Sequence, residues 1–239
     1  MKSVLITGIT GGIGRKLTEA YSSKGYHIYG TCSRNSDSLQ QFKEKWPSVE
    51  IIQINHDDLI DVSTEYSFFF RKVQPDIVIN NAGIVKDNFL VQMSVNDFQE
   101  VLTTNLISAW VIVKEMLLHL NDNKIHKIIN VASISGIIGR EGQCNYAATK
   151  GGLVGLCQLI EHLAPKGSNV ISFSVAPGLI DTDIKGKMPK KKIDNLKKAT
   201  LANRLGTPEE VSKFIFKLSE EDISYSDGTL YRIDGGVLK

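Results

Sequence analysis

Short apolar runs alternate with longer amphipathic stretches along most of the 239-residue chain. The short runs are rich in β-branched residues, as buried strands are, and the longer stretches repeat their apolar positions at helical spacing. This pattern predicts strands at residues 3–7, 26–31, 49–54, 76–80, 126–132, 169–175 and 229–233. It predicts helices at residues 12–24, 38–45, 59–72, 96–119, 146–164 and 208–219.

Alternation of strands and helices is typical of parallel βαβ units, in which helices cover both faces of the sheet. Residues 77–79 and 128–129 are continuous apolar runs, as expected of central strands that are buried on both faces. No internal repeat or Pro/Ser-rich linker divides the chain. We therefore expect an α/β fold: a single doubly wound domain over residues 1–239, with a mainly parallel seven-stranded sheet between two layers of helices.

The composition is that of an ordinary globular protein, with 42% hydrophobic and 23% charged residues and a net charge of +2. This charge does not indicate a nucleic-acid partner. The first apolar run is too short for a secretion signal, and we expect no segment apolar and long enough to span a bilayer. Cys32, Cys144 and Cys157 share no metal-ligand spacing, so we expect free thiols, no metal site and a cytoplasmic protein.

A glycine-rich turn, TGITGGIG at residues 7–14, follows the first predicted strand and opens the first predicted helix. Gly8, Gly12 and Gly14 are spaced Gly-x-x-x-Gly-x-Gly rather than in the usual Rossmann order. Glycines allow the backbone to approach a pyrophosphate, and the helix N-terminus supplies free N–H donors. An ordinary turn is the alternative, but the position at the first strand–helix junction favours a Rossmann-type NAD(P)-binding domain.

The second predicted strand ends without the acidic residue that an NAD site usually places there for the ribose hydroxyls. Cys32 occupies that position, and Ser33 and Arg34 follow it. A hydroxyl and a guanidinium can bind a 2′-phosphate instead, so we expect NADP(H) in preference to NAD(H), with a solvated Arg34 as the alternative. Asn55 is placed to contact the adenine, and the acidic pair at 57–58 is expected to cap the next helix.

Tyr146 and Lys150 are four residues apart in a predicted helix and so lie on one face of it. A free tyrosine has a pKa of about 10, and a neighbouring ammonium lowers that value, so the pair can serve as a general acid or base. Ser133 ends the fifth predicted strand and can hold a substrate carbonyl. Asn105 is a poor helix former inside a long helical stretch and can hold a water chain. Each residue alone also fits a plain structural role, but their order after a phosphate turn indicates a catalytic set.

These residues resemble the short-chain dehydrogenase/reductase family over essentially the whole chain. The resemblance rests on the turn at 7–14, the Asn-Asn-Ala-Gly stretch at 80–83, the catalytic set, the segment 177–182 and the Ile-Asp-Gly-Gly stretch at 233–236. It implies a homotetramer in which Asn105, Ser133, Tyr146 and Lys150 are catalytic. The implied cofactor-binding residues are Gly8, Thr10, Gly12, Ile13, Gly14, Ser33, Arg34, Asn55, Asn81, Ala82, Gly83, Tyr146, Lys150, Pro177, Gly178, Ile180 and Thr182.

Within the family, residues 83–88, 142–146 and 204–210 are most similar to bacterial 3-oxoacyl-[acyl-carrier-protein] reductases. This similarity implies reduction of a 3-oxoacyl thioester by NADPH, in fatty-acid or polyketide-type synthesis. Dehydrogenases of other secondary alcohols, sugars or polyols share the same frame. A catalytically idle cofactor-binding regulator would share the fold, but it has no need of the tyrosine–lysine pair. The chain departs from the group at Gly11, where a basic residue is common, and at His56, where a small apolar residue is typical.

Seven lysines and one acid give residues 185–198 a local charge of +6, so the rest of the chain carries −4. The resemblance places a substrate lid over residues 179–203. A solvated face is one interpretation of the lysines. The other is docking of an acidic acyl-carrier protein or of coenzyme A phosphates, with Lys124 and Lys166 extending the patch. Such docking would weaken as salt increases.

Overall fold

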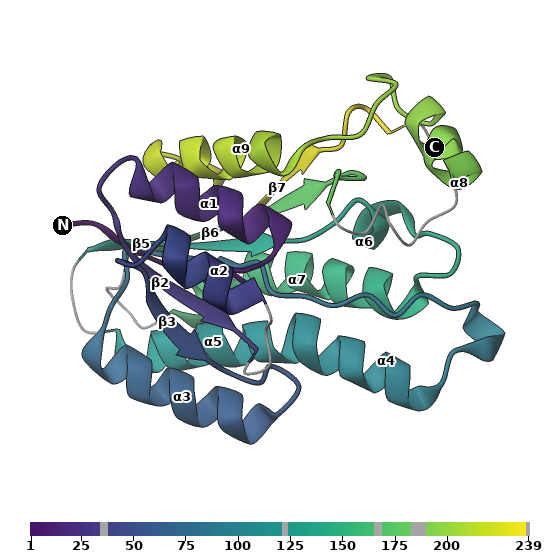
Figure 1. The fold of residues 1–239 in the computed structure, drawn as a ribbon. Helices are drawn as coiled ribbons and strands as arrows, with labels where there is room; N and C mark the ends of the chain where they lie inside the picture. Colours follow the sequence, from purple (N-terminus) through teal and green to yellow (C-terminus); the bar gives the residue numbers. More distant parts are fainter. Residues whose placement is uncertain (34–37, 121–123, 165–168, 183–189, 238–239) are drawn as a thin grey trace.

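A computed structural model describes residues 1–33, 38–120, 124–164, 169–182 and 190–237. Seven parallel strands form one sheet in the order β3-β2-β1-β4-β5-β6-β7 (Figure 1). The strands are β1 (Ser3–Ile6), β2 (His27–Cys32), β3 (Glu50–Gln53), β4 (Ile77–Asn80), β5 (Ile125–Val131), β6 (Asn169–Pro177) and β7 (Thr229–Ile233). The doubly wound seven-stranded fold is therefore confirmed, and every neighbouring pair of strands is parallel.

Helices cover both faces of this sheet (Figure 1). The α-helices are α1 (Gly12–Ser22), α2 (Ser38–Lys45), α3 (Leu59–Lys72), α4 (Val95–Leu102), α5 (Ser108–His119), α6 (Ser135–Ile138), α7 (Cys144–Leu163), α8 (Lys190–Lys198) and α9 (Pro208–Glu220). Helices α1, α2 and α9 pack on one face, and α3, α5 and α7 pack on the other.

The central strands are buried on both faces, as their unbroken apolar runs predict. In β4, Ile77 and Ile79 face the core beneath α1 and α9, whereas Val78 faces the core beneath α3 and α5. All three side chains are at most 3% exposed. This alternation follows from the two-residue period of a strand. It leaves only the strand ends free to present polar groups, which is where the site forms.

The long helix predicted at residues 96–119 is interrupted. Helix α4 leads into a five-residue π-helical turn, η2 (Thr103–Ile107), before α5 begins. The N–H of Ser108 donates to the carbonyl of Thr103, five residues back. One extra residue is thereby accommodated without breaking the helix, and such turns are frequent at functional sites. Asn105 lies at the centre of this turn.

The continuous stretch Val95–His119 corrects the expectation that no segment is long and apolar enough to span a bilayer. By length and composition alone it meets that criterion. Its most apolar window is 61% buried inside the protein, as expected of a core helix packed between α3 and α7.

Several local predictions can be compared directly with the structure. Asp58 caps α3, because its carboxylate accepts from the N–H groups of Ile60 and Asp61. The three cysteines are free thiols. Helices α6 and α8 were not predicted. The strand and helix ends otherwise differ from the predicted ends by at most two residues.

Candidate active site

The glycine turn between β1 and α1 is held in a conformation that only small residues allow. Gly8 has φ +63°, and a Cβ built there would lie 2.8 Å from the Cα of Ala82. A Cβ on Gly14 would lie 2.5 Å from the carbonyl oxygen of Gly8. Glycine at these positions therefore allows the turn to pack against the end of β4 while the N-terminus of α1 stays open.

The residues after β4 fasten this turn to the sheet. The side-chain amide of Asn81 donates to the carbonyls of Thr7 at 2.9 Å and Gly8 at 3.2 Å. In return, the hydroxyl of Thr7 accepts from the N–H groups of Asn81 at 2.9 Å and Ala82 at 2.8 Å. The phosphate turn is thus positioned by a hydrogen-bonded lock between the carboxyl ends of β1 and β4, the point where the strand order reverses.

A cleft runs along the glycine turn from the end of β2 to the start of the π-helical turn η2. We call it the dinucleotide cleft. Its predicted lining residues are Gly8, Thr10, Gly12, Ile13, Ser33, Asn55, Asn81, Ala82, Gly83 and Thr182. Gly14 supports the turn from beneath instead of lining the cleft. Arg34 lies outside the described residues. The cleft also contains residues that the sequence analysis did not assign to it: Gly11, Cys32, Asp57, Ile84, Glu100 and Thr104.

The cleft fits a dinucleotide by two observations besides its glycines. The hydroxyl of Thr182 is buried and has no hydrogen-bond partner in the described part of the chain, so it is available to a group bound in the cleft. A Cβ on Gly12 would lie 3.0 Å from the Cγ2 of Thr182. Glycine at this position therefore keeps the gap open between the glycine turn and the loop that contains Thr182. The residues present can therefore hold a nicotinamide dinucleotide along this edge.

A second hollow, which we call the catalytic pocket, adjoins the cleft and shares Ile13, Asn81, Gly83 and Thr182 with it. The predicted residues Ser133, Tyr146, Lys150, Pro177, Gly178 and Ile180 line it. Parallel strands β5 and β6 place these residues together, because both strands end at the same edge of the sheet. Ser133 lies two residues after the end of β5, and the first half of α7 contributes Tyr146 and Lys150 to the same pocket.

Burial dominates the chemistry of the tyrosine–lysine pair. It raises the pKa of Tyr146 to about 12, against the hydrogen bond from Ser133, which lowers the pKa. Burial also lowers the pKa of Lys150 to about 8. The ammonium of Lys150 donates to the carbonyl of Val131 at 2.7 Å and lies 5.6 Å from the centre of the Tyr146 ring. We expected Lys150 to lower the pKa of Tyr146. The net shift is upward, and the group that lowers this pKa against the effect of burial is the hydroxyl of Ser133.

Asn105 lines neither hollow and lies directly behind them, 1% exposed. Its side-chain oxygen accepts from the N–H of Ile84 at 2.8 Å, and its amide donates to the carbonyl of Ile84 at 3.0 Å. The same oxygen would lie 3.3 Å from a Cβ on Gly83. The residue thus connects the π-turn to the wall of the catalytic pocket, and its side chain is engaged with backbone.

A hydrogen-bonded series on the pocket wall was not predicted from the sequence. The hydroxyl of Ser135 donates to Gln143 at 2.9 Å, and the amide of Gln143 donates to both carboxylate oxygens of Asp87 at 3.1 Å. Arg140, in the turn before α7, also lines the pocket. In sequence these residues look like parts of polar loops, and no spacing rule distinguishes them from solvated side chains.

His56 is buried and lines the dinucleotide cleft, at the position where the family resemblance implies a small apolar residue beside the adenine. Its ring nitrogens lie 3.2 Å from the hydroxyl of Thr31 and 3.3 Å from that of Ser108. Burial lowers the pKa of His56 to about 4, although Asp61 opposes the shift. The ring is therefore neutral at physiological pH and joins β2 to the first turn of α5.

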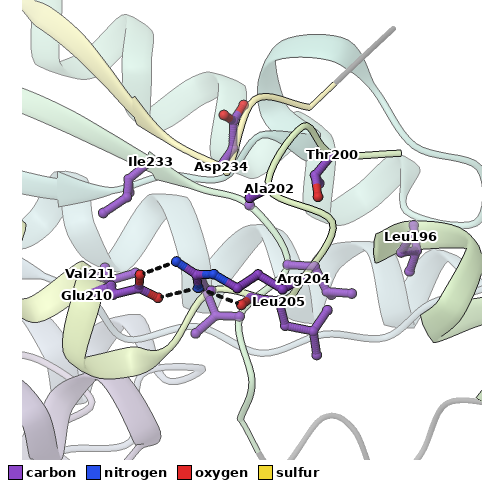
Figure 2. A pocket seen from close by; sticks show the side chains of 14 residues that line it. Leu196, Thr200, Ala202, Arg204, Leu205, Glu210, Val211, Ile233 and Asp234 are labelled. Atoms are coloured by element: carbon purple, nitrogen blue, oxygen red, sulfur yellow. Dashed lines mark hydrogen bonds and ion pairs between the residues drawn. The ribbon is translucent and has the colours of Figure 1, made fainter. Parts of the chain in front are cut away.

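A further pocket adjoins the catalytic pocket and has Leu196 of α8 in its lining, and the two pockets share Gly178, Leu179 and Ile180 (Figure 2). Figure 2 shows Arg204 crossing its floor to Glu210, with contacts of 2.9 and 2.6 Å between the guanidinium and the carboxylate. Leu196 of α8 faces the same space. The predicted lid region thus adjoins the catalytic pocket, and the lysines at 185 and 187 lie outside the described residues.

A cleft that suits a dinucleotide opens onto a pocket that contains a half-buried tyrosine beside a serine and a lysine. Together they define the class: an oxidoreductase that uses a nicotinamide dinucleotide. The family model described as short chain dehydrogenase matches residues 2–193. The chain therefore belongs to the short-chain dehydrogenase family and is an NAD(P)-dependent oxidoreductase.

Curated relatives extend the match over nearly the whole chain. One is a 3-oxoacyl-[acyl-carrier-protein] reductase, FabG, of Thermotoga maritima, 33% identical over 242 residues, which are 99% of this chain and 98% of the relative. Another is the protein of the same name from Aquifex aeolicus, 31% identical over 244 residues, 99% of this chain and 97% of the relative.

A solved structure matches the fold with a TM-score of 0.90 and 24% identity, over 98% of this chain and 95% of the other. It is a Beutenbergia cavernae protein provisionally described as an NAD(P)-dependent gluconate 5-dehydrogenase, with NADP bound at low occupancy. At this identity the likeness supports the Rossmann-type fold and leaves the substrate open.

Proposed function

We propose that this protein reduces a 3-oxoacyl thioester to the 3-hydroxyacyl thioester with NADPH, in fatty-acid or polyketide-type synthesis. The observation that carries the proposal is that Tyr146 lines the catalytic pocket together with Ser133, whose hydroxyl lowers the pKa of Tyr146, and that this pocket opens onto the dinucleotide cleft. The names of the curated relatives, 30% or more identical over 99% of the chain, support the thioester as substrate.

Each side chain of the catalytic set has a distinct role in this proposed reaction. The hydroxyls of Ser133 and Tyr146 hold the ketone oxygen, and Tyr146 supplies the proton to that oxygen as general acid. Because burial raises the pKa of Tyr146, the phenol stays protonated and is ready to donate. Lys150 keeps a positive charge near the phenol and reaches toward the ribose of the cofactor. Asn105 positions the pocket wall, and we infer that it also holds a water that links Lys150 to solvent. The dinucleotide, when bound, supplies the hydride.

The preference for NADP(H) rests on the end of β2. Ser33 lines the dinucleotide cleft, and Cys32 stands where a carboxylate would bind ribose hydroxyls. A neutral residue there leaves room for a 2′-phosphate, to which Ser33 and Arg34 can donate. The solved neighbour contains NADP, which supports the same preference.

We also propose a single domain over residues 1–239 with a lid at 179–203, a cytoplasmic location and a homotetramer. Partly exposed apolar side chains on α5 and α7, among them Trp110, Leu159 and Leu163, support burial against another copy of the chain. We propose that the lysine-rich helix α8, which contributes Leu196 to the pocket adjoining the catalytic pocket, meets an acyl-carrier protein or coenzyme A phosphates.

A second candidate is a dehydrogenase of another secondary alcohol, such as a sugar acid or polyol. The solved neighbour, described as a gluconate 5-dehydrogenase, supports this alternative through the fold. The same pocket chemistry would run in the direction of oxidation, with Tyr146 as general base.

The absorbance of the reduced nicotinamide tests these proposals, with acetoacetyl thioesters as substrates and NADPH and NADH in parallel. We expect rapid oxidation of NADPH, slower oxidation of NADH, and a KM for the carrier-protein thioester that rises steeply with salt. Binding of cofactor without oxidation, together with turnover of a polyol, would replace the first candidate by the second. A KM that ignores ionic strength would contradict docking on the lysines.

A further inference from the structure

Arg140 lies in a tight turn between α6 and α7. Two glycines in this turn adopt positive φ, Gly139 at +69° and Gly142 at +79°. The turn brings Arg140 to the wall of the catalytic pocket, which also contains Ser133 and Tyr146. Both glycines have conformations that other residues rarely adopt, so the turn holds the arginine at the pocket instead of leaving it on a variable loop.

The guanidinium of Arg140 has no hydrogen-bond partner at its buried end. Its Nη2 atom is inaccessible to solvent, and no acceptor in the described part of the chain binds it. The charge of Asp87 acts on Arg140, but both oxygens of that carboxylate already accept from Gln143. Lys150, the other cation lining the pocket among the described residues, donates to the carbonyl of Val131.

A buried cationic donor without an acceptor is unfavourable, and native structures rarely retain one without a reason. A ligand that supplies an oxygen acceptor would remove this penalty and gain a charge-assisted hydrogen bond. The reacting ketone oxygen is already provided for by Ser133 and Tyr146. The same substrate can supply the acceptor for Arg140 through a second oxygen.

We propose that Arg140 binds the acyl oxygen at C1 of a 3-oxoacyl substrate, and so selects ketones that carry a second carbonyl or a carboxylate beyond the reacting carbon. The proposal rests on the function proposed above and deepens it, because it states how the pocket distinguishes a 3-oxoacyl group from a simple ketone. The shared chemistry is an acyl oxygen, which a thioester supplies as a carbonyl and a free 3-oxo acid supplies as a carboxylate.

The test compares substrates with and without the C1 oxygen in wild type and Arg140→Met. The probes are an acetoacetyl thioester, free acetoacetate and the matched thioether ketone in which a methylene replaces the C1 carbonyl. Glu141→Gln is the control variant, because this exposed neighbour in the same turn does not line the pocket. Cofactor affinity and the thermal unfolding midpoint are measured for every variant.

We expect kcat/KM of Arg140→Met for the acetoacetyl thioester to fall about 10- to 100-fold, the range that loss of a hydrogen bond to a charged group produces. Its kcat/KM for the ketone without the C1 oxygen should change less than about twofold, and its unfolding midpoint should stay the same or rise. Glu141→Gln should match wild type throughout. A larger loss with acetoacetate than with the thioester would identify the carboxylate as the natural source of the oxygen.

Equal losses on the substrates with and without the C1 oxygen would overturn the inference, as would a fall in unfolding midpoint that accounts for the lost activity. If wild type reduces thioesters and Arg140→Met shows the same substrate preference, the inference is overturned and the proposed function stands. Failure of wild type to reduce any 3-oxoacyl compound, with other ketones turned over, would overturn the proposed function and this inference together.

Discussion

At the scale of single residues, close backbone approaches decide which positions of the phosphate turn tolerate a side chain. Gly8 and Gly14 have no room for a Cβ, because backbone atoms lie 2.8 Å and 2.5 Å from where it would stand. At Gly11 the nearest atom is 3.4 Å away, an ordinary contact, and φ is not positive. Two glycines of the motif are therefore required by the fold, whereas Gly11 is open to substitution.

Gly8→Ala should weaken dinucleotide binding at least tenfold and lower the free energy of unfolding by about 1–2 kcal/mol, because alanine disfavours the left-handed region and would press on Ala82. Gly155→Ala is the control, at a glycine of α7 that lines neither hollow and has no atom within 4 Å of the added Cβ; it should leave dinucleotide binding unchanged and should not lower the free energy of unfolding. Nicotinamide fluorescence and urea unfolding measure them. Equal effects of the two substitutions would contradict the assigned geometry.

His56 provides a prediction of pH dependence. The pKa of His56 is about 4 in the folded protein, below the usual 6.5. Between pH 4 and pH 6.5 the imidazole is therefore protonated in the unfolded chain and neutral in the folded protein. Stability from this group is therefore complete above pH 6.5 and is lost as pH falls toward 4, about 2–3 kcal/mol by pH 4.5. In His56→Gln the difference in unfolding free energy between pH 7 and pH 4.5 should shrink by that amount. An unchanged difference would show that the ring is not buried and neutral.

At the scale of elements, the π-turn between α4 and α5 connects the helix layer to the site. The turn directs the amide of Asn105 onto both backbone groups of Ile84, next to Gly83 in the pocket wall. The sheet end is then supported from two sides, by the Thr7–Asn81 lock and by this turn. Such support matters because small displacements of reacting groups reduce rate strongly.

Asn105→Ala should lower the free energy of unfolding by about 1–3 kcal/mol, because it leaves two partly buried backbone groups of Ile84 without their side-chain partner. It should also lower kcat. Thr207→Ala, which removes the capping box at the start of α9, should cost about 1 kcal/mol without changing kcat. Urea unfolding and steady-state rates separate the two. Full kcat in Asn105→Ala would assign that residue a purely structural role.

The sequence predicted the strands and most helices because their periods are strong and local. It could not predict the π-turn, since one inserted residue leaves the apolar stripe of 96–119 nearly intact. Helix α6 is only four residues long, and α8 has just two apolar residues, Ile193 and Leu196, among its lysines, which is too few to distinguish a helix from a solvated loop. The phosphate turn and the tyrosine–lysine pair depend on fixed spacings and could be located, whereas Arg140 depends on how a loop folds back over the sheet.

At the scale of the whole molecule, the parallel sheet gathers distant residues at one edge. The ends of β1, β4, β5 and β6 supply Gly8, Asn81, Ser133 and Pro177, and the cleft opens between β1 and β4, where the strand order reverses. The two helix layers bury both faces of the strands and leave this edge accessible. Cofactor and substrate can thus meet in adjoining hollows without any movement of the sheet.

The central claim is that Tyr146 donates the proton in a pocket that adjoins the bound dinucleotide. Reduction of the acetoacetyl thioester by Tyr146→Phe, followed by nicotinamide absorbance with cofactor affinity measured separately, tests it most directly. We predict a fall in kcat of about 10²- to 10⁴-fold, the usual contribution of a general acid, with the dissociation constant for NADPH within about threefold of wild type. A variant that keeps its full rate would contradict the claim.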